Sequence, residues 1–333
     1  MLLSDLHLWA GVLILPYWLR RVGAWIGRGQ IINAGGIMSL SGPSLARNVF
    51  HYPCYNKAPG WRIILIDRVR ESLTMDLGIK GRRALVCASS KGLGRGCAEA
   101  LAGEGVDLIL NARGQEALEQ TAQQIRDTYG VRVDTVAVDV TTEAGQAALL
   151  EAAVDVDILV TNAGGPPPGL WSDWNRDDFI AAFDANLLTP IALIKATLPG
   201  MMQRGWGRIV NITSVAVKAP IPVLGLSNTA RSGLTGYVAG VSRQVAGSGV
   251  TINNLLPGLH DTDRLAMLDK VDAAAQGVTE DAARTARIAT VPAGRFGTSE
   301  EFGAACAWLC SDKAGFVIGQ NILLDGGAFP GAM

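Results

Sequence analysis

Three polar residues near the middle of the chain could polarise a carbonyl group. Ser214 follows residues 208–212, a predicted strand, and Ser227 and Arg231 lie four residues apart in a predicted helix. Residues spaced four apart share one face of a helix, so a hydroxyl group and a cation are expected side by side. An arginine stays protonated, so it can stabilise an oxyanion but carries protons poorly. Residues of these types could stabilise negative charge on a substrate oxygen, and the arginine could instead bind a ribose.

A glycine-rich turn earlier in the chain could bind a dinucleotide. It lies between a predicted strand and a predicted helix, which makes it stronger evidence than the glycines alone. Glycines let the backbone approach a pyrophosphate, which binds at the positive end of the helix. The residues expected to contact the cofactor in this turn are Ala88, Ser90, Lys91, Gly92, Leu93 and Gly94.

The end of the second predicted strand indicates which dinucleotide binds. An acidic residue there would bind the ribose 2′-hydroxyl of NAD, but the strand ends in Leu-Asn-Ala-Arg113. Arg113 can donate two hydrogen bonds to a 2′-phosphate, and Lys91 can add a second positive charge. We therefore predict NADP(H) as the cofactor. The alternative is that both residues are solvated surface charges.

Strands and helices are predicted to alternate through residues 75–333. Apolar runs typical of buried strands lie at residues 84–87, 106–110, 133–138, 158–160, 208–212, 250–255 and 322–324. Helical patterns lie at residues 93–104, 115–129, 143–153, 177–203, 228–246 and 299–310. The alternation predicts one α/β domain, a single doubly wound parallel sheet of the Rossmann type with about seven strands and helices on both faces.

Several motifs in this region resemble those of the short-chain dehydrogenase/reductase family. They are the turn Cys87-Ala-x-x-x-Gly-x-Gly94, Asn162-Ala163-Gly164, Pro257-Gly258 and the tail between Arg295 and Gly327. The resemblance covers about residues 79–328. It is greatest to the branch that is similar to 3-oxoacyl-acyl-carrier-protein reductases.

The resemblance implies a role for each matching residue. The implied cofactor contacts are Asp139 and Val140 at the adenine, Asn162, Ala163, Gly164 and Arg231 near the ribose, and Pro257, Gly258 and Thr262 at the nicotinamide. Ser214 matches the serine that hydrogen-bonds the substrate carbonyl. Asn186 matches the residue that holds a water molecule in the proton relay, and the alternative is a polar residue at a helix kink or cap.

The chain departs from the family at the proton donor. The family's catalytic tyrosine and lysine positions hold Ser227 and Arg231, and none of the five tyrosines has a lysine four residues later. Two functions are therefore predicted. The first is an NADPH-dependent reductase of a carbonyl, by default a 3-oxoacyl thioester, or of an activated double bond. The second is a dinucleotide-binding protein with little or no turnover, acting as a sensor or partner subunit.

Segments around these residues are expected to border the substrate. Residues 165–169, Gly-Pro-Pro-Pro-Gly, form either a wall of the site or simply a stiff loop, and residues 259–290 are expected to form a mobile lid. Lys218 and His260 are titratable but are expected on loop surfaces. A homotetramer or dimer is expected through residues 177–203 and 228–246, although these helices could instead pack on their own sheet. The small and apolar residues that would allow close packing are Ala181, Ala182, Ala185, Leu188, Ala192, Gly233, Gly236 and Gly240.

Composition argues against several other classes of protein. The net charge is -1, and lysine and arginine are not concentrated in one segment, so no basic face for nucleic acid is expected. The five cysteines lack metal-binding spacing, and Cys306 and Cys310 are expected to be small buried side chains. No metal is predicted. The unpatterned cysteines fit a reducing compartment, so a cytoplasmic protein is expected.

Residues 1–74 differ in composition from the rest and leave three interpretations open. They hold four of the eight tryptophans, and residues 27–59 show no sustained helical or strand period. Translation could begin at Met75, the segment could be a disordered or loosely packed extension, or residues 6–26 could be an interfacial or membrane anchor. The apolar run at residues 6–19 is shorter than the roughly 20 residues of a membrane span and contains Pro16, so no membrane partner is expected.

Overall fold

The chain divides into two compact units, Met1–Leu73 and Thr74–Met333. The computed structural model describes residues 25–27, 30–33, 36–39 and 75–331. In the first unit it shows an antiparallel sheet of β1 (Trp25–Gly27), β2 (Gln30–Asn33) and β3 (Gly36–Ser39). The sequence did not predict these strands, because three or four residues are too few to show a period. The anchor proposed for residues 6–26 falls almost wholly outside the described residues.

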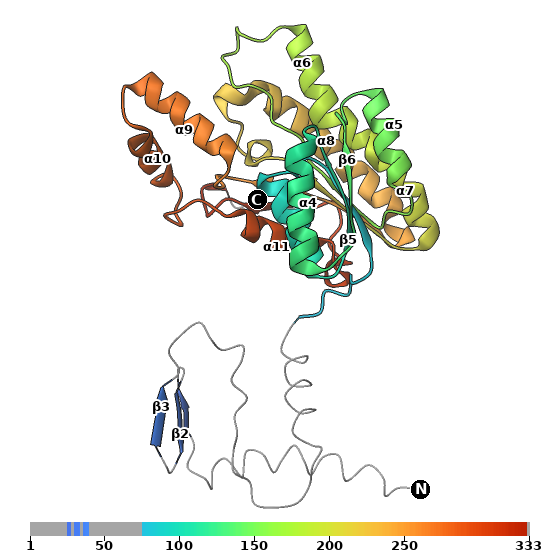
Figure 1. The fold of residues 1–333 in the computed structure, drawn as a ribbon. Coiled ribbons are helices and arrows are strands. Elements are labelled where there is room, and N and C mark those ends of the chain that lie inside the picture. The colour runs from blue at the N-terminus through green and yellow to red at the C-terminus, as the bar shows by residue number, and fades with distance from the viewer. Residues whose placement is uncertain (1–24, 28–29, 34–35, 40–74, 332–333) are drawn as a thin grey trace, which may run out of the picture. The chain divides into compact units, whose positions relative to one another are not determined.

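The second unit is built on a sheet of seven parallel strands (Figure 1). The strands are β4 (Arg83–Val86), β5 (Asp107–Ala112), β6 (Val133–Ala137), β7 (Ile158–Thr161), β8 (Gly207–Ile212), β9 (Val250–Pro257) and β10 (Asn321–Leu324). Their order across the sheet is β10-β9-β8-β7-β4-β5-β6. The strand order reverses between β4 and β7, which is where such sheets bind ligands, at the carboxyl ends of their strands. The predicted doubly wound α/β fold is confirmed.

Helices cover both faces of the sheet. They are α3 (Gly92–Gly103), α4 (Gln115–Tyr129), α5 (Glu143–Ala152), α6 (Arg176–Phe183), α7 (Thr189–Arg204), α8 (Gly225–Val245), α9 (Asp263–Gln276), α10 (Glu280–Ile288) and α11 (Ser299–Leu309). Because side chains alternate along a strand, Val86 packs in a core with α3, α4 and α11, whereas Leu85 packs in a second core with α5, α7 and α8.

Two predicted segments differ in detail. Residues 177–203, predicted as one helix, contain a π-helical turn, η1 (Asp184–Leu188), between α6 and α7. The predicted lid at residues 259–290 contains α9 and α10, which pack on each other and are joined by an ion pair between Arg287 and Asp269.

One helix in the described part of the chain, Arg176–Arg204, is long and apolar enough to cross a membrane by length and composition alone. Its α7 part packs against β7, β8 and α8. A helix layered on a sheet needs apolar residues for this packing, so its composition has a structural explanation.

Polar side chains cross the carboxyl half of the sheet in a row. Thr161 on β7 donates to Asn211 on β8 over 2.7 Å, Asn211 donates to Asn254 on β9 over 3.1 Å, and Asn254 donates to Asn321 on β10 over 2.8 Å. A buried polar group that loses its partner costs about 1–3 kcal/mol. The row therefore fixes the register of these four strands.

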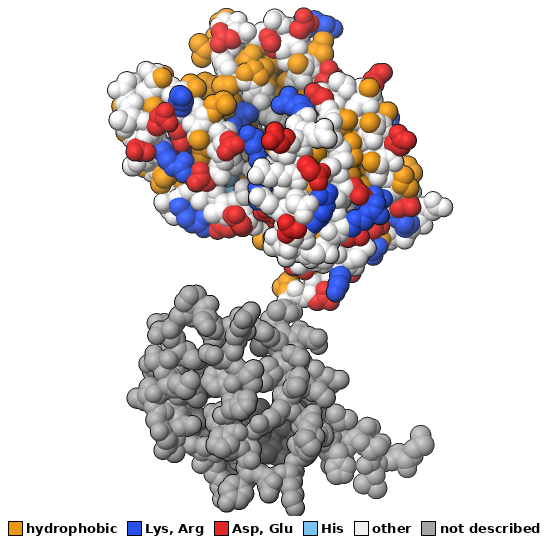
Figure 2. All heavy atoms as spheres, in the orientation of Figure 1, with side chains coloured by type: hydrophobic (Ala, Val, Ile, Leu, Met, Phe, Trp, Pro, Cys, Tyr) orange, Lys and Arg blue, Asp and Glu red, His pale blue; other side chains and the backbone are white. Residues whose placement is uncertain are grey.

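Several large apolar side chains remain exposed around α6. They are Leu170 and Trp171 in the loop before α6, Ile180 on α6, and Val223 shortly before α8. Figure 2 shows hydrophobic side chains gathered at the end of the second unit where α6 lies. This apolar rim is a surface that the sequence pattern did not predict.

Candidate active site

The glycine-rich turn has the geometry of an anion-binding helix start. Lys91 precedes α3 and makes no side-chain capping hydrogen bond, so among the described residues no side chain at the N-cap satisfies the first amides of α3. A Cβ atom on Gly94 would lie 2.3 Å from Ala88 O and 2.9 Å from Asn162 Nδ2, so only glycine fits there. Free amides at a helix N-terminus bind phosphate groups. A dinucleotide pyrophosphate therefore fits this turn.

Ala88 occupies the position where the family usually has its first glycine. Its backbone is left-handed, with φ of 48°, a conformation that costs an L-residue roughly 1–2 kcal/mol. Asn162 Nδ2 donates to Ala88 O over 3.4 Å and Thr121 Oγ1 donates to Ser90 O over 2.9 Å. These contacts from β7 and α4 hold the turn in shape in spite of the alanine.

The residues predicted for the adenine end follow β5 and β6. Thr141 donates to Asp139 Oδ1 from its amide over 3.0 Å and from its hydroxyl over 2.8 Å. These hydrogen bonds lower the pKa of Asp139, with a smaller contribution from the charge of Arg113. Arg113 is exposed, whereas Lys91 pairs with Asp263 over 2.8 Å. Of the two cations predicted for the 2′-phosphate, Lys91 is thus already engaged with an acid.

Asn186 lies in the π-helical turn and is 3% exposed. Its Nδ2 donates to Gly164 O over 3.4 Å, while its Oδ1 has no hydrogen-bond partner within the described structure. Leaving a buried acceptor unpaired costs about 1–3 kcal/mol, so a water molecule or a ligand atom is expected against this oxygen. Asn186 therefore sits at a helix distortion and also presents the free acceptor that a relay water requires.

Ser214, Ser227 and Arg231 lie where the end of β8 meets the start of α8. Ser214 Oγ accepts a hydrogen bond from Ala216 N over 3.1 Å, and Ser227 Oγ accepts one from Arg231 Nε over 3.2 Å. Arg231 Nη1 donates to the carbonyl oxygens of residues 212 and 213, both over 2.8 Å. The guanidinium thus connects Ser227 to the backbone that leads directly into Ser214.

Arg231 is an almost fully buried cation, 8% exposed. Burial lowers its pKa to about 10, with a smaller contribution from the positive charge of Arg264. A group with this pKa stays charged at neutral pH. Its Nη2 makes none of the hydrogen bonds that Nε and Nη1 make to described residues, so this nitrogen can donate to a ligand.

The start of the predicted lid lies against the glycine-rich turn. A Cβ atom on Gly92 would be 3.7 Å from Thr262 Cγ2, and one on Gly258 would be 2.5 Å from Asp325 Cβ. Pro257 ends β9, so Gly258 and Thr262 follow directly at the carboxyl edge of the sheet. The structure thus brings the residues predicted for the nicotinamide to the same edge as the pyrophosphate turn.

Arg264, in the first turn of α9, is a site residue that the sequence analysis missed. Its Nη1 donates to Gly165 O over 2.8 Å and its Nη2 donates to Pro166 O over 3.2 Å. A Cβ atom on Gly165 would lie 2.7 Å from the guanidinium carbon, so the arginine rests on this glycine. No sequence signal marks the contact, because its partners are backbone carbonyls 98 and 99 residues earlier in the chain.

His260 was predicted on a loop surface, and this prediction is wrong. The ring is 7% exposed and lies edge-on to Phe302, with ring centroids 5.2 Å apart. Burial lowers its pKa below the ordinary value. The ring packs against Phe302 of α11, a contact that the polar sequence around His260 does not reveal. Lys218 is partly exposed, with its Nζ 5.9 Å from the centre of the Phe329 ring.

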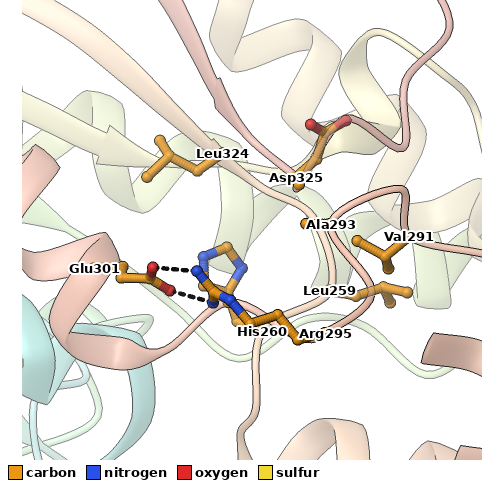
Figure 3. Close-up of a pocket in the computed structure, with 10 residues that line it drawn as sticks. Leu259, His260, Val291, Ala293, Arg295, Glu301, Leu324 and Asp325 are labelled. Carbon is orange, nitrogen blue, oxygen red and sulfur yellow. Dashed lines mark hydrogen bonds and ion pairs between the residues drawn. The ribbon is translucent and has the colours of Figure 1, made fainter. Parts of the chain in front are cut away.

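His260 also lines a cavity of about 190 Å³ at the ends of β9 and β10 (Figure 3). Arg295 and Glu301 pair at its edge through two hydrogen bonds of 2.8 and 2.6 Å. This pairing lowers the pKa of Glu301 to about 2. The four residues predicted for catalysis do not line this cavity, so it is separate from the candidate reaction site.

Four cysteines of the second unit are buried with free thiols, Cys87, Cys97, Cys306 and Cys310. The prediction of buried side chains for Cys306 and Cys310 is confirmed. Across the residues that the structure describes, no group of three or more histidine, cysteine, aspartate or glutamate side chains could hold a metal ion.

Comparison with known proteins identifies the family. A family model described as enoyl-(acyl carrier protein) reductase matches residues 87–328. The 3-oxoacyl-acyl-carrier-protein reductase of Vibrio cholerae is 34% identical over 259 residues, which are 76% of this chain and 99% of that protein. The chain therefore belongs to the short-chain dehydrogenase/reductase family, as its motifs predicted, and is an oxidoreductase of that family.

Solved structures of this family superimpose on the second unit. L-sorbose reductase from Gluconobacter frateurii, in complex with NADPH and L-sorbose, matches with a TM-score of 0.74 and 28% identity, covering 77% of this chain and 100% of that one. A 3-oxoacyl-acyl-carrier-protein reductase from Agrobacterium tumefaciens with NADP bound matches with a TM-score of 0.69 and 30% identity, covering 77% and 98%. The second unit thus corresponds to nearly the whole length of these enzymes.

Proposed function

We propose that the protein is an NADP(H)-dependent reductase in which Ser214, Ser227 and Arg231 act on a carbonyl group. The cofactor is NADP(H), because the two solved relatives contain NADPH or NADP and the second strand of the sheet leads into Arg113 with no acidic residue at its end. NADPH supplies the hydride when bound. Reduction adds this hydride to the carbonyl carbon and a proton to the oxygen, which gives an alcohol.

The observation that carries the proposal is that both serine oxygens already accept a hydrogen bond. Ser214 Oγ accepts from a backbone amide, and Ser227 Oγ accepts from Arg231 Nε. These N–H groups can only donate, so each serine hydrogen is left available for a substrate oxygen. Two hydroxyl donors, one of them held by a buried guanidinium, are suited to stabilise negative charge on that oxygen.

The proton has a different source from that in the family. A serine hydroxyl is a much poorer acid than a tyrosine, so Ser227 hydrogen-bonds the oxygen and does not protonate it. Arg231 remains charged and supports Ser227. We assign the proton to a water molecule at Asn186, whose Oδ1 is the buried acceptor without a partner in the described residues.

A 3-oxoacyl thioester is the default substrate, by analogy with the reductases of Vibrio cholerae and Agrobacterium tumefaciens. The exposed apolar rim formed by Leu170, Trp171, Ile180 and Val223 supports a substrate with an acyl chain. An activated double bond is the second candidate, because the same two hydroxyl groups would stabilise an enolate oxygen. Residues 165–169 then form one wall of the site, held by Arg264.

The test is NADPH oxidation by the full-length protein with 3-oxoacyl thioesters, simple ketones, quinones and enones. We expect turnover with at least one class. Ser214→Ala and Ser227→Ala should each lower kcat about 10²- to 10³-fold, the usual effect of removing one oxyanion donor. The double variant Ser227→Tyr with Arg231→Lys restores the family's pair, and a gain in ketone reduction would show that the remaining site is competent.

A protein that binds NADPH but oxidises it with no substrate would contradict the reductase. That result would favour the second candidate, a dinucleotide-binding protein that acts as a sensor or partner subunit. The free amides of the glycine-rich turn support cofactor binding in either case. Turnover is therefore the measurement that separates the two.

We also propose a cytoplasmic homotetramer formed through α7 and α8. Gly236 and Gly240 on α8 are exposed, and an added Cβ would meet nothing within 4 Å, so a second helix could approach closely. Ala182 on α6 is instead buried in its own unit. A monomer in sedimentation at micromolar concentration would contradict the assembly.

A further inference from the structure

Two arginines of the candidate site have no carboxylate partner among the described residues, although most described arginines do. Arg287, for example, pairs with both Asp269 and Asp272. Arg231 bonds to Ser227 and to backbone carbonyls, and Arg264 bonds to backbone carbonyls only. The charge of Arg264 is close enough to lower the pKa of Arg231. The reaction end therefore holds two neighbouring positive charges that no described carboxylate balances.

Arg264 lies at the border of this site and remains accessible. Burial lowers its pKa, yet the residue as a whole keeps an exposed surface. It rests on Gly165 O, and the preceding carbonyl, Gly164 O, accepts the hydrogen bond from Asn186. The guanidinium is thus one peptide unit away from the contact that holds Asn186. A group bound to Arg264 would therefore lie near Asn186, to which we assign the water of the proton relay.

We propose that Arg264 binds an anionic group of the substrate, a carboxylate close to the carbonyl or double bond that is reduced. The inference rests on the proposed function, since it names the substrate class for the same site. A guanidinium has five N–H donors in a fixed fork, and two bonds to carbonyls leave donors for a carboxylate. Arg231 adds attraction through its charge while it holds Ser227. The substrate class is then a free oxo acid or its unsaturated counterpart, in place of the 3-oxoacyl thioester that analogy alone gives as the default.

Two other roles would give Arg264 different properties. The phosphate groups of the cofactor are a second source of negative charge, and a role there predicts weaker NADPH binding when the arginine is removed. If Arg264 only links α9 to residues 165–166, its removal should weaken the binding of charged and neutral substrates equally. If Arg264 recognises a carboxylate, its removal should weaken the binding of the charged substrate only, and NADPH binding should be retained.

The experiment compares oxo acids with their methyl esters, which differ in charge at one position. The full-length protein is saturated with NADP⁺, which has no hydride to give, and the Kd of each acid and ester is measured by isothermal titration calorimetry. Charge-assisted hydrogen bonds are worth about 1.5–3 kcal/mol, so the wild-type protein should bind an acid roughly 10- to 100-fold more tightly than its ester. Arg264→Gln should bring this ratio close to one, and Arg264→Lys should restore part of it.

Arg176→Gln is the matched control, because Arg176 is an exposed arginine at the start of α6 whose contact with Asp177 is long, 3.9 Å. This variant should keep the preference for acids. The proposal is overturned if the wild-type protein binds acids and esters equally or binds neither. It is also overturned if Arg264→Gln weakens NADPH binding, or lowers acid and ester binding alike. NADPH oxidation with a neutral ketone or thioester would still support the reductase in each of these cases.

Discussion

The nucleotide half and the reaction half of the second unit share one sheet but satisfy their polar groups differently. In the nucleotide half, neutral side chains hold the turn, as Asn162 does by donating to Ala88 O, and Asp139 accepts from its neighbour Thr141. In the reaction half, the guanidinium groups of Arg231 and Arg264 bond to carbonyls and retain their charge. The comparison teaches that the glycine-rich turn is held by neutral amide and hydroxyl groups, whereas the proposed reaction end is held by cations.

The reaction half also shows what the exchange of tyrosine and lysine for Ser227 and Arg231 preserves. A hydroxyl and a cation still lie four residues apart on one face of α8, now joined by a hydrogen bond of 3.2 Å. A serine is smaller than a tyrosine. We therefore propose that the site admits a water molecule beside the substrate and still stabilises a substrate oxygen.

The largest effect is expected from Gly94→Ala in the nucleotide half. The added Cβ would lie 2.3 Å from Ala88 O, so the turn must move away from the start of α3. NADPH affinity should fall by at least about 100-fold, because the turn could no longer present its amides to the pyrophosphate. Fluorescence titration with NADPH measures the change.

Gly103→Ala is the matched control on the same helix. A Cβ atom there would meet Tyr129 at 3.6 Å, which is ordinary contact, so NADPH affinity should be unchanged. An unchanged NADPH affinity in Gly94→Ala would show that the dinucleotide does not bind at this turn. The turn would then not belong to a nucleotide half of the second unit.

The sequence predicted apolar elements well and polar contacts between distant residues poorly. All seven strands were predicted near their observed positions because each contains a short apolar run, although β6 and β10 are only partly buried. Helix α4 was predicted from residue 115 to 129 as observed. The π-turn at Asn186 was not predicted, since one widened turn leaves the apolar pattern of residues 177–203 nearly intact. Arg264 was missed because its partners are backbone carbonyls, which every residue has, so no particular residue in the sequence marks the contact. Sequence patterns thus predict burial well and long-range polar contacts poorly.

A smaller effect is expected from Arg113→Ala, which tests the choice of cofactor. Losing charge-assisted hydrogen bonds to a 2′-phosphate costs about 1.5–3 kcal/mol, so NADPH affinity should fall roughly 10- to 100-fold while NADH affinity stays the same. Competition binding with the two nucleotides measures both values. Arg176→Ala, on the exposed start of α6, should change neither. Equal affinity of the wild-type protein for NADH and NADPH would contradict the assignment of Arg113.

The smallest expected effect is a change in stability with pH caused by His260. This residue is the one histidine of residues 75–333 and lies at the start of the predicted lid. Its pKa in the folded protein is lowered by burial from an ordinary value of 6.5. Above pH 6.5 the ring is neutral in both the folded and unfolded states, so its burial does not lower the free energy of unfolding. As the pH falls below 6.5, the unfolded chain takes up the proton first, so the free energy of unfolding decreases. For one proton, the free energy of unfolding changes by at most about 1.4 kcal/mol per pH unit.

Thermal unfolding between pH 7 and pH 5 measures this dependence. The carboxyl groups with lowered pKa values are Glu119, Asp139, Glu300 and Glu301, whose ordinary values are 3.8 for the aspartate and 4.5 for the glutamates, so their contributions fall off mainly below this range. His260→Gln removes the titrating group, and its melting temperature should vary less across the range than that of the wild-type protein. An equal variation in both would mean that His260 is solvated in the folded protein. The contact between His260 and Phe302 would then be absent, and the segment predicted to contact the nicotinamide would be less ordered than the pyrophosphate turn.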